Sequence, residues 1–200
     1  EIVLHSGIPD TTVADEVLGH LFMSSWQLGS DIDWTELPPN SDVEWTYYLN
    51  RFLFWRDLAD AYWGTGDEAY AIEWVDQLTD WIQDRPAPSS PTMSDVSWRT
   101  LEAGIRVPNF AYAFSKFLHS PNFTDDALIL FLKSMVEHAE YLLASPSSGN
   151  NWVIIETLGL VHAAVLFPEF ADADDWYDTA FARLQSELAS QINPYGSHVE

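Results

Sequence analysis

Two adjacent asparagines, Asn150 and Asn151, stand where a serine- and glycine-containing turn passes into an apolar run, in the segment SSGNNWVIIE. Asparagine is among the best helix N-cap residues, because its side-chain oxygen accepts a hydrogen bond from a free N–H of the first turn. An amide at a helix N-terminus can also meet a bound anion, since the partial positive charge there favours negative groups. Both interpretations stand for Asn151, and they are compatible if Asn150 provides the cap.

Two further polar or aromatic side chains follow on the same expected helix. Trp152 and Glu156 are four residues apart and share a helix face, whereas Asn151 points elsewhere. We interpret Glu156 as an orienting or structural carboxylate and Trp152 as a candidate for contact with a ligand. His162 lies about 16 Å along the helix from Asn151, and its apolar neighbours indicate a packed core histidine.

A third group of candidates precedes these residues by about 50 positions. Glu102 and Arg106 have the i,i+4 spacing of an ion pair on a helix surface. Alternatively, Arg106 points into a cleft, where its guanidinium can bind a carboxylate or sulfate through two parallel hydrogen bonds. Trp98, just before them, is the other tryptophan kept as a cleft candidate, because most of the ten tryptophans have helical spacing and are expected in the core.

The last candidates lie in an aromatic helical segment nearer the start of the chain. We expect Arg51 to stack on Trp55, and Asn50 to contact a substrate. The histidines are scattered, and no metal-binding spacing such as HExxH occurs, so we expect neither a metal nor a cofactor.

The elements that must position these side chains are helices. Apolar residues recur with a helical period over most of the chain, and no segment of strand period competes with them. The breaks near residues 64, 121 and 168 recur every 50 residues or so, which divides the chain into three helix pairs. The expected helical segments are 43–67, 67–85, 94–120, 123–145, 150–167 and 171–192.

The helix pairs predict an all-α fold in one domain, residues 1–200. We expect an array of antiparallel αα-hairpins with buried helices inside and amphipathic helices outside, either as a solenoid or as part of an α/α toroid. GTG at 64–66 should end one helix, and Asp67 with Glu68 should open the next. Thr124 should cap another helix, and Pro108 should kink the segment that contains it.

The charge balance limits the partners. The 31 acidic residues against eight basic ones give a formal net charge of −23, which disfavours nucleic acid and anionic membranes as partners. No apolar stretch is long enough to span a membrane, and the start EIVLHSGIPD lacks the features of a signal peptide. The acidity indicates either an ordinary soluble acidic protein or adaptation to high salt.

Several motifs occur in an order that resembles a known family. They are LNR, LADAYWGTGDEAYA, WRTLEAGIR, GNNWVIIETLGL, LFPEF and INPYGSHVE, between residues 34 and 200. Together they resemble the helical N-terminal domain of the heparinase II/III-like polysaccharide lyases. The resemblance implies an incomplete α/α toroid whose remainder, with β-sandwich domains, follows residue 200. It also implies cleavage of uronic-acid-containing polysaccharides by β-elimination, in a secreted or periplasmic protein.

The resemblance also gives Asn151 a role. It implies that the Asn151 amide neutralises the uronate carboxylate, so that the adjacent C5 proton can be removed and the enolate-like intermediate stabilised. A tyrosine and a histidine would act as acid and base, and the family's order places both beyond Glu200. The sequence departs from the family at Tyr195, where aspartate is usual, and at Trp152, where several relatives have histidine. The candidate substrate-binding residues are Asn50, Trp98, Glu102, Arg106, Trp152 and Glu156.

Two hypotheses about function result. The first is an enzyme, the helical domain of a lyase whose partner is an acidic polysaccharide. The alternative is a non-catalytic helical repeat module that binds a glycan or a protein. The net charge should slow the approach of a polyanion, unless the glycan is less charged than heparin, as alginate is, or salt screens the repulsion.

Overall fold

The computed structural model describes residues 10–90, 95–148 and 150–197. This part of the chain is predominantly helical, which confirms the predicted all-α class. No helix within it has the length and apolar character needed to cross a membrane. The elements in chain order are α1 (Thr12–Leu18), β1 (Leu21–Phe22), β2 (Trp26–Gln27), α2 (Val43–Leu49), α3 (Phe54–Thr65), α4 (Glu68–Asp84), α5 (Thr100–Phe117), α6 (Asp125–Ala144), α7 (Trp152–Leu166) and α8 (Ala173–Gln191).

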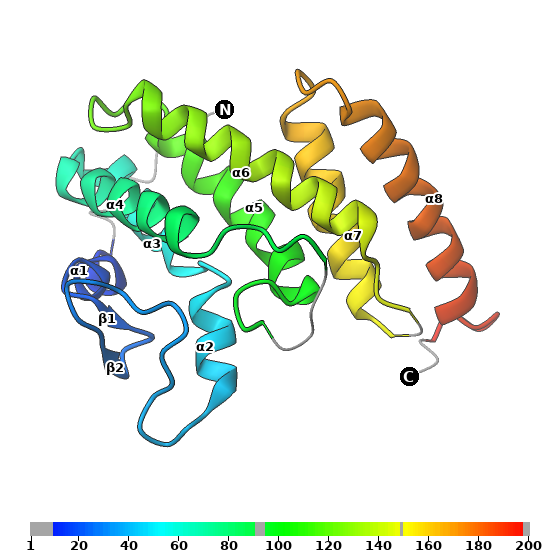
Figure 1. The fold of residues 1–200 in the computed structure, drawn as a ribbon, viewed down its shortest axis with the longest axis horizontal. Coiled ribbons are helices and arrows are strands. Elements are labelled where there is room, and N and C mark those ends of the chain that lie inside the picture. Colours follow the sequence, from blue (N-terminus) through cyan, green and yellow to red (C-terminus); the bar gives the residue numbers. More distant parts are fainter. Residues whose placement is uncertain (1–9, 91–94, 149, 198–200) are drawn as a thin grey trace.

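The last six helices form three antiparallel hairpins arranged in two layers (Figure 1). In one layer α5 packs between α3 and α7, and in the other α6 packs between α4 and α8. Helix α5 is buried around most of its circumference, whereas α8 is buried only along a narrow stripe. This arrangement is the predicted array of buried and amphipathic helices, and it gives an all-α, toroid-like domain.

Local sequence signals set several of the helix ends. Gly66, with φ of 71°, ends α3 in the left-handed conformation that glycine adopts without steric cost. The side chain of Asp67 then accepts a hydrogen bond from the N–H of Ala69 at the start of α4. Thr124 caps α6 in the same way through the N–H of Ala127. These three predicted boundaries are confirmed.

The predicted single helix 43–67 is wrong, because the chain breaks between α2 and α3. Phe52 has a φ of 54°, which is rare for a residue with a side chain. Its ring is fully buried and packs 4.2 Å from the ring of Trp55 and 5.5 Å from that of Phe110, centroid to centroid. Burying this ring offsets backbone strain of about 1–3 kcal/mol, an exchange that helical periodicity does not reveal.

Three other features differ from the expectations or extend them. Helix α1 and the antiparallel pair β1–β2 precede the first hairpin, in a region where the periodicity predicted no element. Helix α5 includes Pro108 and continues through it as one helix, and the kink expected there stays a prediction. Residues 1–9 and the last three letters of YGSHVE lie outside the described residues, so the expectations about the chain start and about that motif stay predictions.

Helices α5 and α7 approach each other most closely at two glycines. A Cβ atom added to Gly104 would lie 2.8 Å from the Cα of Glu156, and one added to Gly159 would lie 2.8 Å from the Cα of Gly104. Carbon atoms in contact are ordinarily 3.5–4.0 Å apart, so neither position has room for a side chain. The two glycines therefore fix how closely α7 lies against α5.

Candidate active site at the N-terminus of α7

Asn151 occupies the N-cap position of α7, but its side chain does not make the capping hydrogen bond. Asn150 does so instead, since its Oδ1 accepts from the N–H of Trp152 at 2.9 Å. Asn151 is exposed at a helix end whose partial charge is positive. The geometry therefore assigns the cap to Asn150, and Asn151 is an exposed residue beside it. That the Asn151 amide faces a substrate groove stays a prediction.

Trp152 is half-buried and packs against a side chain that the sequence analysis did not select. The guanidinium carbon of Arg99 lies 4.8 Å from the Trp152 ring centroid and 3.5 Å from that of Tyr47 on α2. Arg99 is thus held between two aromatic rings from different elements. Its membership of the motif WRTLEAGIR, three residues before Glu102, was the one sequence signal that could have identified it.

Glu102 joins this stack to the core. Its carboxylate is fully buried and accepts hydrogen bonds from Nη2 of Arg51 at 2.8 Å and from Nη2 of Arg99 at 2.7 Å. The predicted ion pair between Glu102 and Arg106 on a helix surface is wrong, because both side chains are buried and the carboxylate serves other arginines. Glu102 therefore supports the site from behind and does not reach a substrate.

Arg106 does not point into a cleft, so that alternative is also wrong. The side chain is completely buried, with Nη2 donating to the carbonyl of Ser97 at 2.6 Å. Its guanidinium carbon lies 4.2 Å from the ring centroid of Trp81 and 5.1 Å from that of Trp98. Burial lowers the pKa of Arg106 to about 9, although Glu102 favours its charged form.

Trp98 is likewise a core residue, and its prediction as a cleft residue is wrong. It is 1% exposed, and its indole N–H donates to the carbonyl of Arg85 at 2.8 Å. Indole N–H groups usually find a partner of this kind when buried.

Asn50 cannot contact a substrate either, so its prediction as a substrate-binding residue is wrong, as for Arg106 and Trp98. It is fully buried and its amide donates to the carbonyls of Trp34 and Thr46, while its oxygen accepts from the indole of Trp81. All the polar atoms of Asn50 thus have partners inside the protein.

Arg51 also differs from its expectation. Its guanidinium carbon lies 4.2 Å from the ring centroid of Tyr48, and the predicted stacking on Trp55 is not the contact it makes. The carboxylate it serves, Glu102, is 51 residues further along the chain.

Glu156 orients the residues around it, which agrees with its interpretation as an orienting or structural carboxylate. It is too deeply buried to contact a substrate, so its prediction as a substrate-binding residue is wrong. It is 1% exposed and accepts from the N–H and the hydroxyl of Ser147, at 2.8 Å and 2.6 Å. The hydroxyl of Thr100, the first residue of α5, donates to the same carboxylate. Glu156 thus ties the segment before Asn151 to the start of α5.

The scarce basic side chains are concentrated beside this site. The sequence has eight lysines and arginines, and three arginines, at positions 51, 99 and 106, surround the single carboxylate of Glu102. Two further acids act on this group, Asp95 on Arg106 and Glu44 of α2 on Arg99. Glu44 is solvent-exposed, where water and salt screen its effect. The N-terminal end of α7 thus combines arginines with the two buried carboxylates of Glu102 and Glu156.

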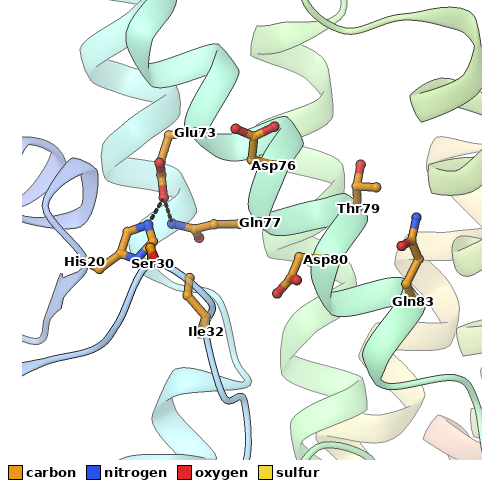
Figure 2. Close-up of a pocket in the computed structure, with 9 residues that line it drawn as sticks. All are labelled: His20, Ser30, Ile32, Glu73, Asp76, Gln77, Thr79, Asp80 and Gln83. Atoms are coloured by element: carbon orange, nitrogen blue, oxygen red, sulfur yellow. Dashed lines mark hydrogen bonds and ion pairs between the residues drawn. The ribbon is translucent and has the colours of Figure 1, made fainter.

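A pocket of about 380 Å³ lies elsewhere, between α4 and the segment around β1 and β2 (Figure 2). Glu73, Asp76 and Asp80 line it, and Nε2 of His20 lies 3.1 Å from Oε1 of Glu73. Burial raises the pKa of both Glu73 and Asp80. Three acids on its walls make this pocket a poor site for a uronate. No group of three potential metal ligands occurs among the residues that the structure describes.

The two layers of hairpins form an all-α, toroid-like domain. The model of the family described as heparinase II/III N-terminus matches residues 8–200, and the chain belongs to this family.

Individual relatives agree with this assignment. The chain is 35% identical to a heparin-sulfate lyase of Pedobacter heparinus, over 94% of this chain and 29% of the relative. It is 31% identical to a heparin-sulfate lyase of Bacteroides stercoris, over 97% of this chain and 32% of the relative. The crystal structure of heparan sulfate lyase HepC from Pedobacter heparinus superposes with a TM-score of 0.84 at 34% identity, covering 95% of this chain and 31% of that one. The chain therefore spans about a third of the length of the relatives it matches.

Proposed function

We propose that the chain is the helical part of a polysaccharide lyase that cleaves a uronate-containing acidic glycan by β-elimination. The observation that carries the proposal is the position of Asn151. Asn151 is an exposed residue at the α7 N-terminus, and the capping hydrogen bond there is made by Asn150. Relatives named as heparin-sulfate lyases support the substrate class.

The proposed role of Asn151 is electrostatic. A uronate carboxylate carries negative charge beside the C5 proton, which makes that proton hard to remove. An amide donor and the positive end of α7 withdraw this charge and stabilise the enolate-like intermediate. Removing a single donor of this kind costs about 10²–10³ in kcat. The net charge of −23 slows the approach of a polyanion, and dissolved salt screens that repulsion.

The test uses the whole protein, with heparan sulfate, heparin, hyaluronan, chondroitin and alginate as substrates. Elimination introduces a double bond conjugated to the uronate carboxylate, so ultraviolet absorbance follows turnover directly. We expect Asn151→Ala to lower kcat by about 100-fold or more. The matched control is Asn122→Ala, since Asn122 precedes α6 instead of α7 and donates to Glu68 of α4.

Wild-type turnover by Asn151→Ala would exclude the proposed role of the amide. Absence of turnover on every glycan, together with retained binding, would instead favour the non-catalytic binding module.

A further inference from the structure

The residues that lead up to Asn151 belong to no helix or strand, yet buried side chains hold them. Residues 145–148 and 150–151 connect α6 to α7 without regular secondary structure. Three side chains from three different places in the fold reach this connection or the residue that follows it. They are Arg99, which precedes α5, Glu156 of α7, and Gln191, the last residue of α8.

Glu156 and Gln191 hold the part that precedes Asn151. The Glu156 carboxylate accepts two hydrogen bonds from Ser147, and Thr100 donates to the same carboxylate. Gln191 is 6% exposed, and its amide donates to the carbonyl of Asn150 at 3.0 Å. Since that carbonyl belongs to the peptide unit that leads into Asn151, Gln191 restrains the backbone directly before the amide.

Arg99 holds the residue that follows Asn151. The edge of its guanidinium is fixed by two hydrogen bonds to the buried carboxylate of Glu102. Its two faces are then available to aromatic rings, and they pack on Tyr47 and Trp152. The buried ion pair of Arg99 and Glu102 therefore fixes the position of Trp152.

We infer that Arg99, Glu156 and Gln191 are positioning residues, which together fix the Asn151 amide relative to the substrate carboxylate. This inference rests on the proposed function of Asn151. None of the three needs to touch the substrate, and Glu156 is too deeply buried to do so. A displacement of about 1 Å at a reacting centre can cost on the order of 10²-fold in rate, so losing one restraint should lower kcat while leaving KM nearly unchanged.

Two substitutions in the whole protein test this inference, each leaving the substrate-facing residues intact. Arg99→Lys keeps the positive charge but loses the planar group that makes the paired hydrogen bonds and the stacking. Gln191→Leu keeps most of the volume and removes the donor to Asn150. We expect each to lower kcat by roughly 10- to 100-fold, with KM changed by less than about threefold. Arg85→Lys is the matched control, because Arg85 also pairs with a carboxylate, Asp95, at 2.9 Å, but does not contact the connection.

Hydrogen exchange gives a readout that does not depend on turnover. The N–H groups of Ser147 and Trp152 are hydrogen-bonded to Glu156 and Asn150. We expect both to exchange at least about tenfold faster in Arg99→Lys and Gln191→Leu, and to be unchanged in Arg85→Lys.

Three results would overturn the inference: wild-type kcat in both variants, a rise in KM with unchanged kcat, or unchanged exchange of the two amides. If Arg99→Lys does not fold, the kcat, KM and amide exchange of Gln191→Leu alone test the inference. Wild-type kcat in both variants beside an inactive Asn151→Ala would remove this inference and leave the proposed function standing. A fully active Asn151→Ala would remove both.

Discussion

Gly104 is the position where a single added methyl group should matter most for the fold. In Gly104→Ala the new Cβ would lie 2.8 Å from the Cα of Glu156 and 2.8 Å from the carbonyl oxygen of Ile155. Both are backbone atoms, so no side chain can rotate away. Restoring an ordinary contact of about 3.5 Å requires α5 and α7 to separate by roughly 0.7 Å at the crossing.

The expected cost combines two opposing effects. Overpacking of this kind costs about 1–3 kcal/mol, and the upper part of that range applies because backbone has to move. Alanine is better than glycine in a helix interior by about 1 kcal/mol. We therefore expect Gly104→Ala to lower the free energy of unfolding by about 1–2 kcal/mol. Because α7 carries Asn151 at its end, kcat should also fall.

Urea unfolding of wild type and variant measures the difference, with the slope checked for two-state behaviour. Gly29→Ala is the control, because its added Cβ would lie 3.5 Å from the carbonyl oxygen of Asp31, an ordinary contact, and the φ of Gly29 is not positive. We expect a change within about 0.5 kcal/mol there. A Gly104→Ala protein as stable as wild type would refute the reasoning, since it would mean that the helix crossing is not held at the spacing described.

Three further predictions concern stability. Glu102→Gln should lower the free energy of unfolding by about 3–5 kcal/mol, because the buried guanidinium groups of Arg51 and Arg99 lose their counter-charge. The control Glu137→Gln, at the exposed pair with Lys133, should change it by less than about 1 kcal/mol. Equal effects of the two substitutions in urea unfolding would contradict this prediction. Burial holds the pKa of His138 well below 6.5 in the folded protein, so at low pH the unfolded chain binds a proton that the folded protein does not. The free energy of unfolding should therefore fall as the pH drops below about 6.5. In urea titrations between about pH 7.5 and 5, His138→Phe should flatten this pH dependence, and an unchanged dependence would argue against the prediction. Thr124→Ala should cost about 1 kcal/mol through loss of the α6 cap, and an unchanged urea midpoint would show that the cap is dispensable.

The helix array was predictable because its signals are local. Caps such as Asp67 and Thr124 act within three residues, and the apolar period reports the buried face of each helix directly. The exception is Phe52, where tertiary packing of one ring outweighs the local preference for a continuous helix.

The candidate site was predictable only in part, because its contacts are not local. Asn151 and Asn150 could be assigned from the helix start they share. Of the two arginines that bond Glu102, in contrast, Arg51 is 51 residues away, and the i,i+4 spacing to Arg106 suggested a pair that does not form. A helical period also cannot tell a side chain that faces a cleft from one that faces another helix, so Trp98 and Asn50 were placed on the wrong side.

The distribution of charge divides the ionic groups into two populations that dissolved salt treats differently. Among the described acids only Glu102 and Glu156 are buried, and the rest are at least partly open to solvent. At molar salt the screening length is about 3 Å. Salt then weakens the repulsion between exposed carboxylates, but it hardly affects the buried contacts between guanidinium groups and Glu102. High salt should therefore weaken the repulsion between surface carboxylates and leave the buried ion pairs of Glu102 intact. The free energy of unfolding should then rise with salt concentration, whereas it falls in many proteins that depend on surface ion pairs.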